Sequence, residues 1–170
     1  MVRAFLAWWL GGLALFALVL WLHAPLAIPA VPGGIGNHQA AGSAAEVERI
    51  HAAWRAAGVY GTARTAMIAD LVFIGVYTLG AALGGRVLRA SGGGTMRLIG
   101  DAVLAGAVVF GVTDYVETVC QLVQLVQDEG SNALAATAAT VRPVKIIAWI
   151  ATFVGILAGL AVRRFVARSS

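Results

Sequence analysis

The stretch Gly111-Val-Thr-Asp-Tyr-Val-Glu-Thr-Val-Cys-Gln-Leu-Val-Gln124 places two acids and two amides inside a long apolar run. On a helix that turns about 100° per residue, these four polar side chains share an arc of roughly 80°. They are Asp114, Glu117, Gln121 and Gln124. A single acid in the middle of a membrane span costs about 2.5–3.5 kcal/mol on insertion scales. The stretch therefore predicts a membrane helix whose polar stripe faces compensating groups on other helices.

The composition extends this prediction to the whole chain. Of its 170 residues, 60% are hydrophobic and only 12% are charged, whereas a soluble domain carries about 25% charged residues. We therefore expect one integral membrane domain over residues 1–170. The net charge of +4 is interpreted as a topology signal and not as a nucleic-acid surface, because the arginines flank apolar runs. With Cys120 as the one cysteine, disulfides and cysteine zinc sites within the chain are excluded.

Four apolar runs are long enough to cross a bilayer, so the expected fold is an all-α bundle of four transmembrane helices. The expected spans cover about residues 4–22, 65–87, 98–126 and 141–162. The first run also resembles a signal peptide in its beginning, Met1-Val-Arg-Ala-Phe. Its apolar core of about 19 residues exceeds the usual 7–15, and His23-Ala-Pro is a poor cleavage site. We favour a retained first helix.

The loop 23–63 is the longest segment that does not span the membrane. Its first half, Pro25 to Gly42, is rich in proline and glycine, which argues against regular structure. Ser43-Ala-Ala-Glu46 is a capping box that predicts a short amphipathic helix over about residues 44–57, with Val47, Ile50 and Trp54 on one face. This helix lies either on the membrane surface or bundle, or as a lid over a site between the spans.

The distribution of arginine predicts the orientation. Arg86, Arg89 and Arg97 flank the short loop between the second and third spans, and Arg163, Arg164 and Arg168 follow the fourth. Short positively charged loops stay in the cytoplasm. We therefore expect a multi-pass protein of the cell membrane, the inner membrane if the host is a bacterium, with both termini cytoplasmic and the loop 23–63 outside. Asp101 is expected to pair locally with Arg97, one turn away.

The same topology brings polar residues of three spans to one depth, in the outer half of the bundle. At about 1.5 Å per residue, these positions converge within a turn or two. The candidate ligand-binding or proton-accepting residues are Asp70, Tyr77, Asp114, Glu117, Gln121, Arg142 and Lys145. Three acids face two bases, so one acid is unmatched. Desolvation beside like charges favours the neutral form of a carboxyl, and we expect one of the three acids to be protonated near neutral pH.

Several other kinds of site are disfavoured. His23, His38 and His51 fall in the loop 23–63, so a bis-histidine haem within the membrane is excluded. A metal site built from these histidines is a minor alternative to solvent-exposed loop histidines. Gly33-Gly-Ile-Gly36 lacks the strand-to-helix context of a dinucleotide loop. No cofactor is expected.

Two functions follow from this pattern. The first is a carrier or membrane-embedded enzyme that binds a small or amphipathic ligand, because ionisable groups inside membranes tend to mark substrate or proton paths. Glu117 or Asp114 would accept a proton or pair with a cation, Lys145 and Arg142 would hold an anionic group, and Tyr77 would orient it. The alternative is an accessory subunit whose ion pairs are purely structural and whose Gly155 and Gly159 face another membrane protein or a second copy. In both cases the chain's environment is the lipid bilayer, with no nucleic-acid partner.

Overall fold

The computed structural model of the chain describes residues 1–166, and the side chains of residues 1–164, so Arg168 lies outside the described residues. Four of its helices are long and apolar enough to cross a membrane. They are α1 (Val2–His23), α4 (Tyr60–Arg89), α5 (Gly94–Gln127) and α6 (Asn132–Val166). Within the described residues, the chain is helical except for turns and one isolated bridge between Ile28 and Val31. The predicted all-α four-helix membrane bundle is confirmed.

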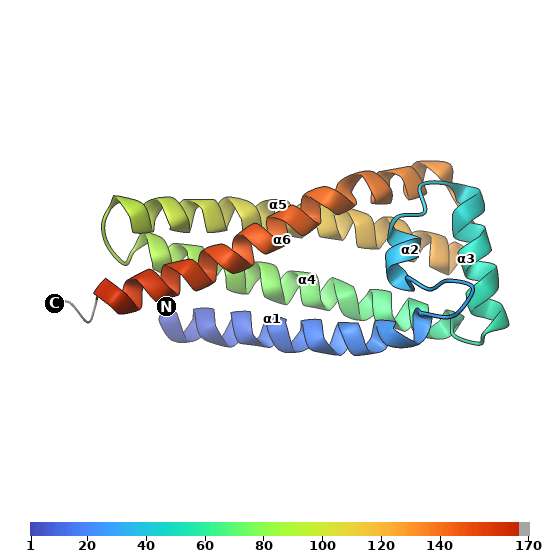
Figure 1. The fold of residues 1–170 in the computed structure, drawn as a ribbon, viewed down its shortest axis with the longest axis horizontal. Helices are drawn as coiled ribbons and strands as arrows, with labels where there is room; N and C mark the ends of the chain where they lie inside the picture. Colours follow the sequence, from blue (N-terminus) through green and yellow to red (C-terminus); the bar gives the residue numbers. More distant parts are fainter. Residues whose placement is uncertain (167–170) are drawn as a thin grey trace.

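The four long helices run side by side along the length of the molecule, and α6 crosses the others diagonally (Figure 1). Each helix packs on the next in the order α1, α4, α5, α6. The backbones of α1 and α6 do not pack along one another in the described chain. These two helices meet through aromatic side chains, with the rings of Trp9 and Phe153 centred 5.8 Å apart and those of Phe16 and Trp149 5.3 Å apart. The bundle is therefore least tightly closed between α1 and α6.

Close contact between α1 and α4 depends on glycine. A Cβ on Gly80 would lie 2.6 Å from the backbone nitrogen of Trp9, and a Cβ on Gly12 would lie 2.8 Å from the Cα of Tyr77. Small residues let membrane helices approach until their backbones touch, which increases dispersion contacts where no hydrophobic driving force exists. The first helix is thus an integral part of the bundle.

One end of the bundle is covered by residues 24–59, which we call the cap. It contains a 3₁₀ turn (Ala24–Leu26), α2 (Ile35–Gln39) and α3 (Ala44–Ala56), and α3 lies across the ends of the long helices (Figure 1). Leu26, Ile50 and Trp54 are fully buried in its core. The indole Nε1 of Trp54 donates a hydrogen bond to the carbonyl oxygen of Leu26, 3.0 Å away. The amphipathic face predicted for residues 44–57 is therefore buried on the bundle.

Two local expectations for the cap are wrong in detail. The segment from Pro25 to Gly42 is not wholly irregular, because it contains α2. The turn before α2 is held by the backbone N–H of Gly33, which donates to Oδ1 of Asn37 over 2.7 Å. The capping box is half formed: the Ser43 hydroxyl accepts from the backbone N–H of Glu46 over 3.3 Å, but the Glu46 carboxylate binds Arg49 and does not return to Ser43.

The opposite end, which we call the arginine end, contains Arg86, Arg89 and Arg97 together with the start of α1 and the last described turns of α6 (Figure 1). Asp101 pairs here with Arg89 of the neighbouring helix, at 2.8 Å between Oδ1 and Nε. The predicted Arg97 pairing is therefore wrong, because the closely packed α4 brings a nearer guanidinium. The fourth long helix also begins earlier than its expected span and continues through Pro143 without interruption.

Candidate functional site

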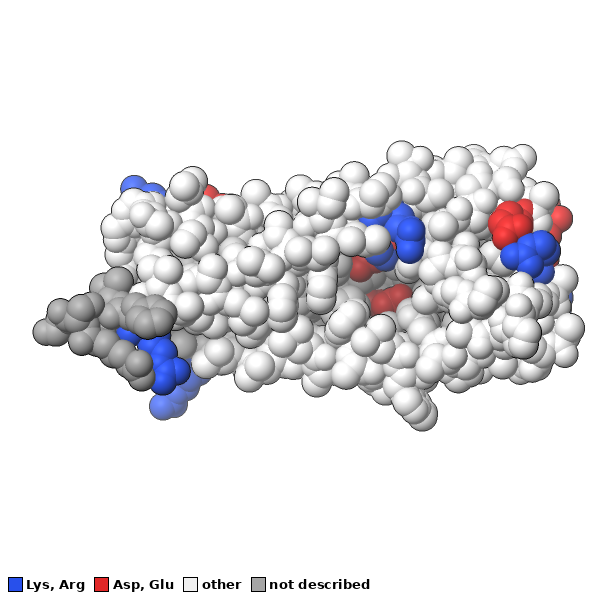
Figure 2. Space-filling view, in the orientation of Figure 1, with Lys and Arg blue, Asp and Glu red and all other residues white. Residues whose placement is uncertain are grey.

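A cavity of about 290 Å³ lies between the long helices, next to the cap. Figure 2 shows it as a hollow with acidic atoms at its floor and basic atoms at its rim. All four long helices and α2 contribute to it. Its lining consists of Phe16, Val19, Leu20, His23, Ile35, Gln39, Asp70, Phe73, Phe110, Asp114, Lys145, Ile146, Trp149 and Ile150. Within the half of the bundle nearest the cap, charged side chains therefore face a common cavity.

Lys145 of α6 joins the cavity to the polar stripe of α5. Its Nζ lies 2.8 Å from Oδ1 of Asp114 and also contacts a carboxylate oxygen of Glu117. These side chains are 12%, 6% and 0% exposed respectively. Removing such charges from water is costly, and only close contact with opposite charges compensates the cost. One ammonium thus neutralises part of the charge on two carboxylates.

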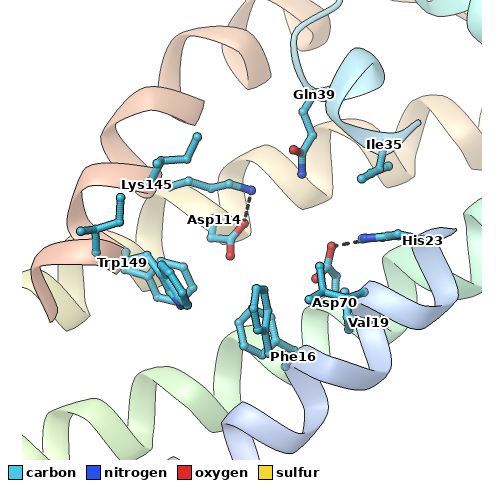
Figure 3. Close-up of a pocket in the computed structure, with 14 residues that line it drawn as sticks. Phe16, Val19, His23, Ile35, Gln39, Asp70, Asp114, Lys145 and Trp149 are labelled. Carbon is cyan, nitrogen blue, oxygen red and sulfur yellow. Dashed lines mark hydrogen bonds and ion pairs between the residues drawn. The ribbon is translucent and has the colours of Figure 1, made fainter. Parts of the chain in front are cut away.

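Asp70 of α4 has a much weaker partner. His23, the last residue of α1, places Nε2 at 3.7 Å from Oδ2 of Asp70, which is beyond hydrogen-bonding distance. Nε2 of His23 is buried and has no hydrogen-bond partner among the described residues. Figure 3 shows the two ion pairs on opposite sides of the cavity, with the space between them open.

The short helix α2 closes the cavity toward the cap. Ile35 and Gln39 are one helical turn apart and both line the cavity, and the Gln39 amide points toward the space between the two ion pairs (Figure 3). His38 lies on the other side of α2, against α3. The lid alternative given above concerns the longer amphipathic helix over residues 44–57, which is α3, but it is α2 that adjoins the cavity.

The remaining walls are aromatic and aliphatic, and one side lies at the surface of the bundle. The ring of Phe16 is centred 5.4 Å from that of Phe73 and 5.3 Å from that of Trp149. At the rim, Leu20 of α1 is 53% exposed, and Ile146 and Ile150 of α6 are 40% and 49% exposed. These aliphatic side chains lie where the backbones of α1 and α6 do not pack together. The cavity therefore opens sideways between α1 and α6.

The structure places the predicted site residues in three groups. Asp70, Asp114 and Lys145 line the cavity, and Glu117 lies behind it in contact with Lys145. Gln121 and Arg142 are not cavity-lining residues: the amide of Gln121 is buried without a hydrogen bond within the described chain, and Arg142 reaches toward Gly36 of α2.

The third group is Tyr77, which does not reach the cavity. It is fully buried among aromatic rings, with Phe110 centred 5.2 Å away and Trp149 6.2 Å away. The expected role of Tyr77 in orienting a ligand thus has no geometric support. Gln124, at the end of the polar stripe, is used locally, because its amide accepts from the backbone N–H of Ser131 over 3.0 Å.

Sequence reasoning missed the contribution of α1 and of the cap to this site. The sequence pattern places His23 in the loop 23–63, yet His23 ends α1 at the depth of Asp70. Phe16, Val19 and Leu20 carry no polar signal, so the sequence predicts only an apolar span there. The position of His23 one turn beyond Val19, at the end of a long apolar helix, was the signal that could have revealed it.

A second buried polar group lies within the cap. Nε2 of His38 and Nε2 of His51 are 3.0 Å apart, and the side chains are 2% and 1% exposed. One imidazole must donate and the other accept, so the pair is neutral. Burial, and to a lesser extent His51, lowers the pKa of His38 to about 3. Burial lowers the pKa of His51 to about 4, against the opposing effect of Asp128.

This arrangement corrects the expectation for the three histidines. His38 and His51 are buried and hydrogen-bonded to each other, and His23 faces Asp70. The three histidines are therefore not solvent-exposed loop residues, and they do not share one site. Within the described residues, no group of three or more histidine, cysteine, aspartate or glutamate side chains is placed to hold a metal ion.

Comparison of the chain with protein-family models, with curated proteins and with solved structures finds no match.

Proposed function

We propose that this protein binds an amphipathic small molecule in the cavity between α1, α4, α5 and α6, as a carrier or as a membrane-embedded enzyme. The observation that carries the proposal is a cavity with charged groups on its floor and an aliphatic opening toward the bilayer. A ligand with a polar head and an apolar tail matches this gradient, because each part is transferred to surroundings of its own polarity.

We also propose how the chain is oriented in the membrane. The arginine end lies in the cytoplasm and the cap lies outside, since short arginine-rich loops remain cytoplasmic. In a bacterium this places the cap in the periplasm and the bundle in the inner membrane. The ligand then reaches the cavity from the outer leaflet, through the opening between α1 and α6, while α2 covers the cavity from the aqueous side.

The alternative of a purely structural cluster is favoured by one observation, the double pairing of Lys145 with Asp114 and Glu117. Such a network joins α5 to α6 without any ligand. The small-residue motif offers the accessory-subunit alternative no support. A Cβ on Gly155 would lie 2.8 Å from Val103, and one on Gly159 would lie 2.6 Å from Leu88. Both glycines are thus used inside this bundle.

The test is to identify what the purified protein carries. The protein is extracted from its native membrane in a neutral detergent, and bound amphiphiles are measured by mass spectrometry. We expect one amphiphile at near-stoichiometric amount in the wild type. It should be lost in Ile150→Trp, which fills the opening of the cavity, and retained in Ile147→Trp.

Ile147 is the matched control because it is 69% exposed on the same helix and does not line the cavity. Equal amphiphile content in the two tryptophan variants would contradict binding in the cavity. Absence of any bound amphiphile from wild type, together with failure of added amphiphiles to bind, would favour the structural alternative.

A further inference from the structure

The charges that face the cavity are unequal in number. Of the side chains that line it in the described part of the chain, Asp70 and Asp114 are carboxylic acids, and Lys145 is the matching ammonium. Lys145 is also in contact with Glu117, so its single charge is shared between two acids. An anionic ligand would bring another negative charge to a site that already has a surplus of acids. The site therefore lacks at least one positive charge.

Asp70 is the acid that this deficit leaves without a close partner. The nearest basic atom is Nε2 of His23, 3.7 Å away. Asp70 is only 7% exposed, and Nε2 of His23 has no hydrogen-bond partner among the described residues. A buried carboxylate without a donor is unfavourable, and a ligand that donates hydrogen bonds from a positive group removes that cost.

The walls next to Asp70 suit the same kind of head group. Phe73 is on the same helix as Asp70, and its ring is tilted by 36° against that of Phe16 of α1, which in turn packs against Trp149 of α6. Aromatic faces attract cations through their quadrupole, and the attraction increases when both are removed from water. Beyond these rings, Leu20 and Ile150 lead from the cavity to the lipid.

We propose that the ligand is a cationic amphiphile, a lipophilic amine whose ammonium group binds Asp70 and the surrounding aromatic rings while its tail extends between α1 and α6. This assignment rests on the proposed function and names the chemical class of its ligand. It revises the expectation that Lys145 and Arg142 hold an anionic group, because Lys145 is engaged by two acids and Arg142 does not line the cavity.

The binding step also moves a proton. Without the amine, we expect one extra proton to be held either by the Asp70 carboxyl or by the neighbouring His23 imidazole, 3.7 Å away. When the ammonium binds Asp70, that proton is no longer needed for neutrality and is released to water. The amine itself keeps its proton throughout. Binding of the amine should therefore acidify a weakly buffered solution, and binding of a neutral amphiphile should not.

The experiment uses three labelled probes with the same dodecyl tail: dodecylamine, dodecanol and dodecyl phosphate. Binding to the full chain in phosphatidylcholine nanodiscs is measured at pH 7 as the saturable signal above that of empty nanodiscs. We expect dodecylamine to bind at least about tenfold more tightly than the other two, since a charge-assisted hydrogen bond is worth more than a neutral one.

Variants of Asp70 test whether its carboxylate causes the preference for dodecylamine. Asp70→Asn should weaken dodecylamine binding about tenfold or more and leave dodecanol binding the same or tighter, whereas Asp70→Glu should retain a preference for the amine. The control is Asp101→Asn, whose carboxylate pairs with Arg89 at the arginine end and is half exposed. Retained helical circular dichroism and a single gel-filtration peak confirm that each variant is folded.

The possible results distinguish a failure of the amine assignment from a failure of the proposed function. If dodecanol or dodecyl phosphate binds as tightly as dodecylamine and Ile150→Trp removes that binding, the amine assignment is overturned and the cavity remains a binding site. If Asp70→Asn leaves the amine preference unchanged, the assignment to Asp70 is overturned. If none of the probes binds above empty nanodiscs, both the ligand class and the proposed function fail.

Discussion

In the half of the bundle toward the arginine end, α1 and α4 touch through glycine and aromatic side chains, whereas near the cap charged side chains of these helices face a cavity. In the first region, Gly80 lies against the backbone of Trp9, and a Cβ there would have no room. In the second, Asp70 and His23 face each other across 3.7 Å, with open space beside them. The same two helices, α1 and α4, make both arrangements.

The difference teaches where this bundle is tightly packed and where it is held open. Gly80 and Asp70 are separated by about 15 Å along α4, at 1.5 Å per residue. Close packing of small residues at one end stabilises the bundle without any need for polar groups. Polar groups can then remain at the other end although they are costly to bury, and such groups in a membrane commonly serve a function.

The largest expected effect comes from breaking the ion pairs near the cap. Lys145→Met leaves Asp114 and Glu117 facing each other without a counter-ion, and removal of one member of a buried pair costs about 3–5 kcal/mol. We expect this loss in the free energy of unfolding, measured by SDS titration in neutral micelles. By comparison, Asp101→Asn breaks a half-exposed pair at the arginine end and should cost less than about 1 kcal/mol.

A triple variant distinguishes lost attraction from uncompensated charge. Adding Asp114→Asn and Glu117→Gln to Lys145→Met removes the acids that were left behind. Most of the stability should return, because the cost lies in the buried charges and not in a missing contact. If the triple variant is as unstable as Lys145→Met, the side chain of Lys145 stabilises the bundle in another way.

The next largest effect is expected from a substitution in the tightly packed region between α1 and α4. Gly80→Val places a branched side chain against the backbone of α1, and overpacking of this kind costs about 1–3 kcal/mol and forces the helices apart. The same SDS titration measures it. Gly61→Val is the control, because a Cβ on Gly61 of the same helix meets nothing within 4 Å. Equal stability of the two variants would contradict the close contact between α1 and α4.

A smaller effect is expected from pH, through the histidine pair of the cap. The pKa of His38 is lowered to about 3 and that of His51 to about 4, mainly by burial, whereas an unfolded histidine titrates near 6.5. Between these values the unfolded chain binds more protons than the folded one, so stability is complete above pH 6.5 and falls as the pH decreases. Between pH 7 and pH 5.5 we expect the free energy of unfolding to decrease by about 2 kcal/mol.

The double variant His38→Phe with His51→Phe isolates this contribution from that of the acids around the cavity. Phenylalanine keeps an aromatic ring beside Trp54, which packs against both imidazoles, and it cannot be protonated. The pH dependence between 7 and 5.5 should become flatter in this variant. An unchanged slope would show that groups other than the histidine pair bind the protons.

The sequence allowed prediction of the helices and of part of the site. Asp70, Asp114, Glu117 and Lys145 stand out because polar residues in apolar runs mark the face that a membrane helix turns toward its neighbours. Helical periodicity then shows which of them share a face. It does not show which helices are neighbours, so the opening between α1 and α6 could not be foreseen.

The contributions of His23, Gln39 and the pair of buried histidines were hidden for a different reason. His23 follows an apolar run, and the boundary of a run does not define the boundary of a helix. The helix containing Gln39 has only five residues, in a segment rich in proline and glycine, and it is stabilised by burial between the cavity and α3. Propensity and pattern carry no signal for structure that depends on such tertiary contacts.

The central claim is that an amphiphile lies with its head at Asp70 and its tail between α1 and α6. It is tested most directly with a dodecylamine that carries a diazirine at the end of its tail, photolysed in nanodiscs and mapped by peptide mass spectrometry. We predict labelling concentrated at Leu20, Ile146 and Ile150 and abolished by Asp70→Asn. Labelling spread evenly to lipid-facing positions on other faces, such as Ile68 and Val112, and unchanged by Asp70→Asn, would contradict it.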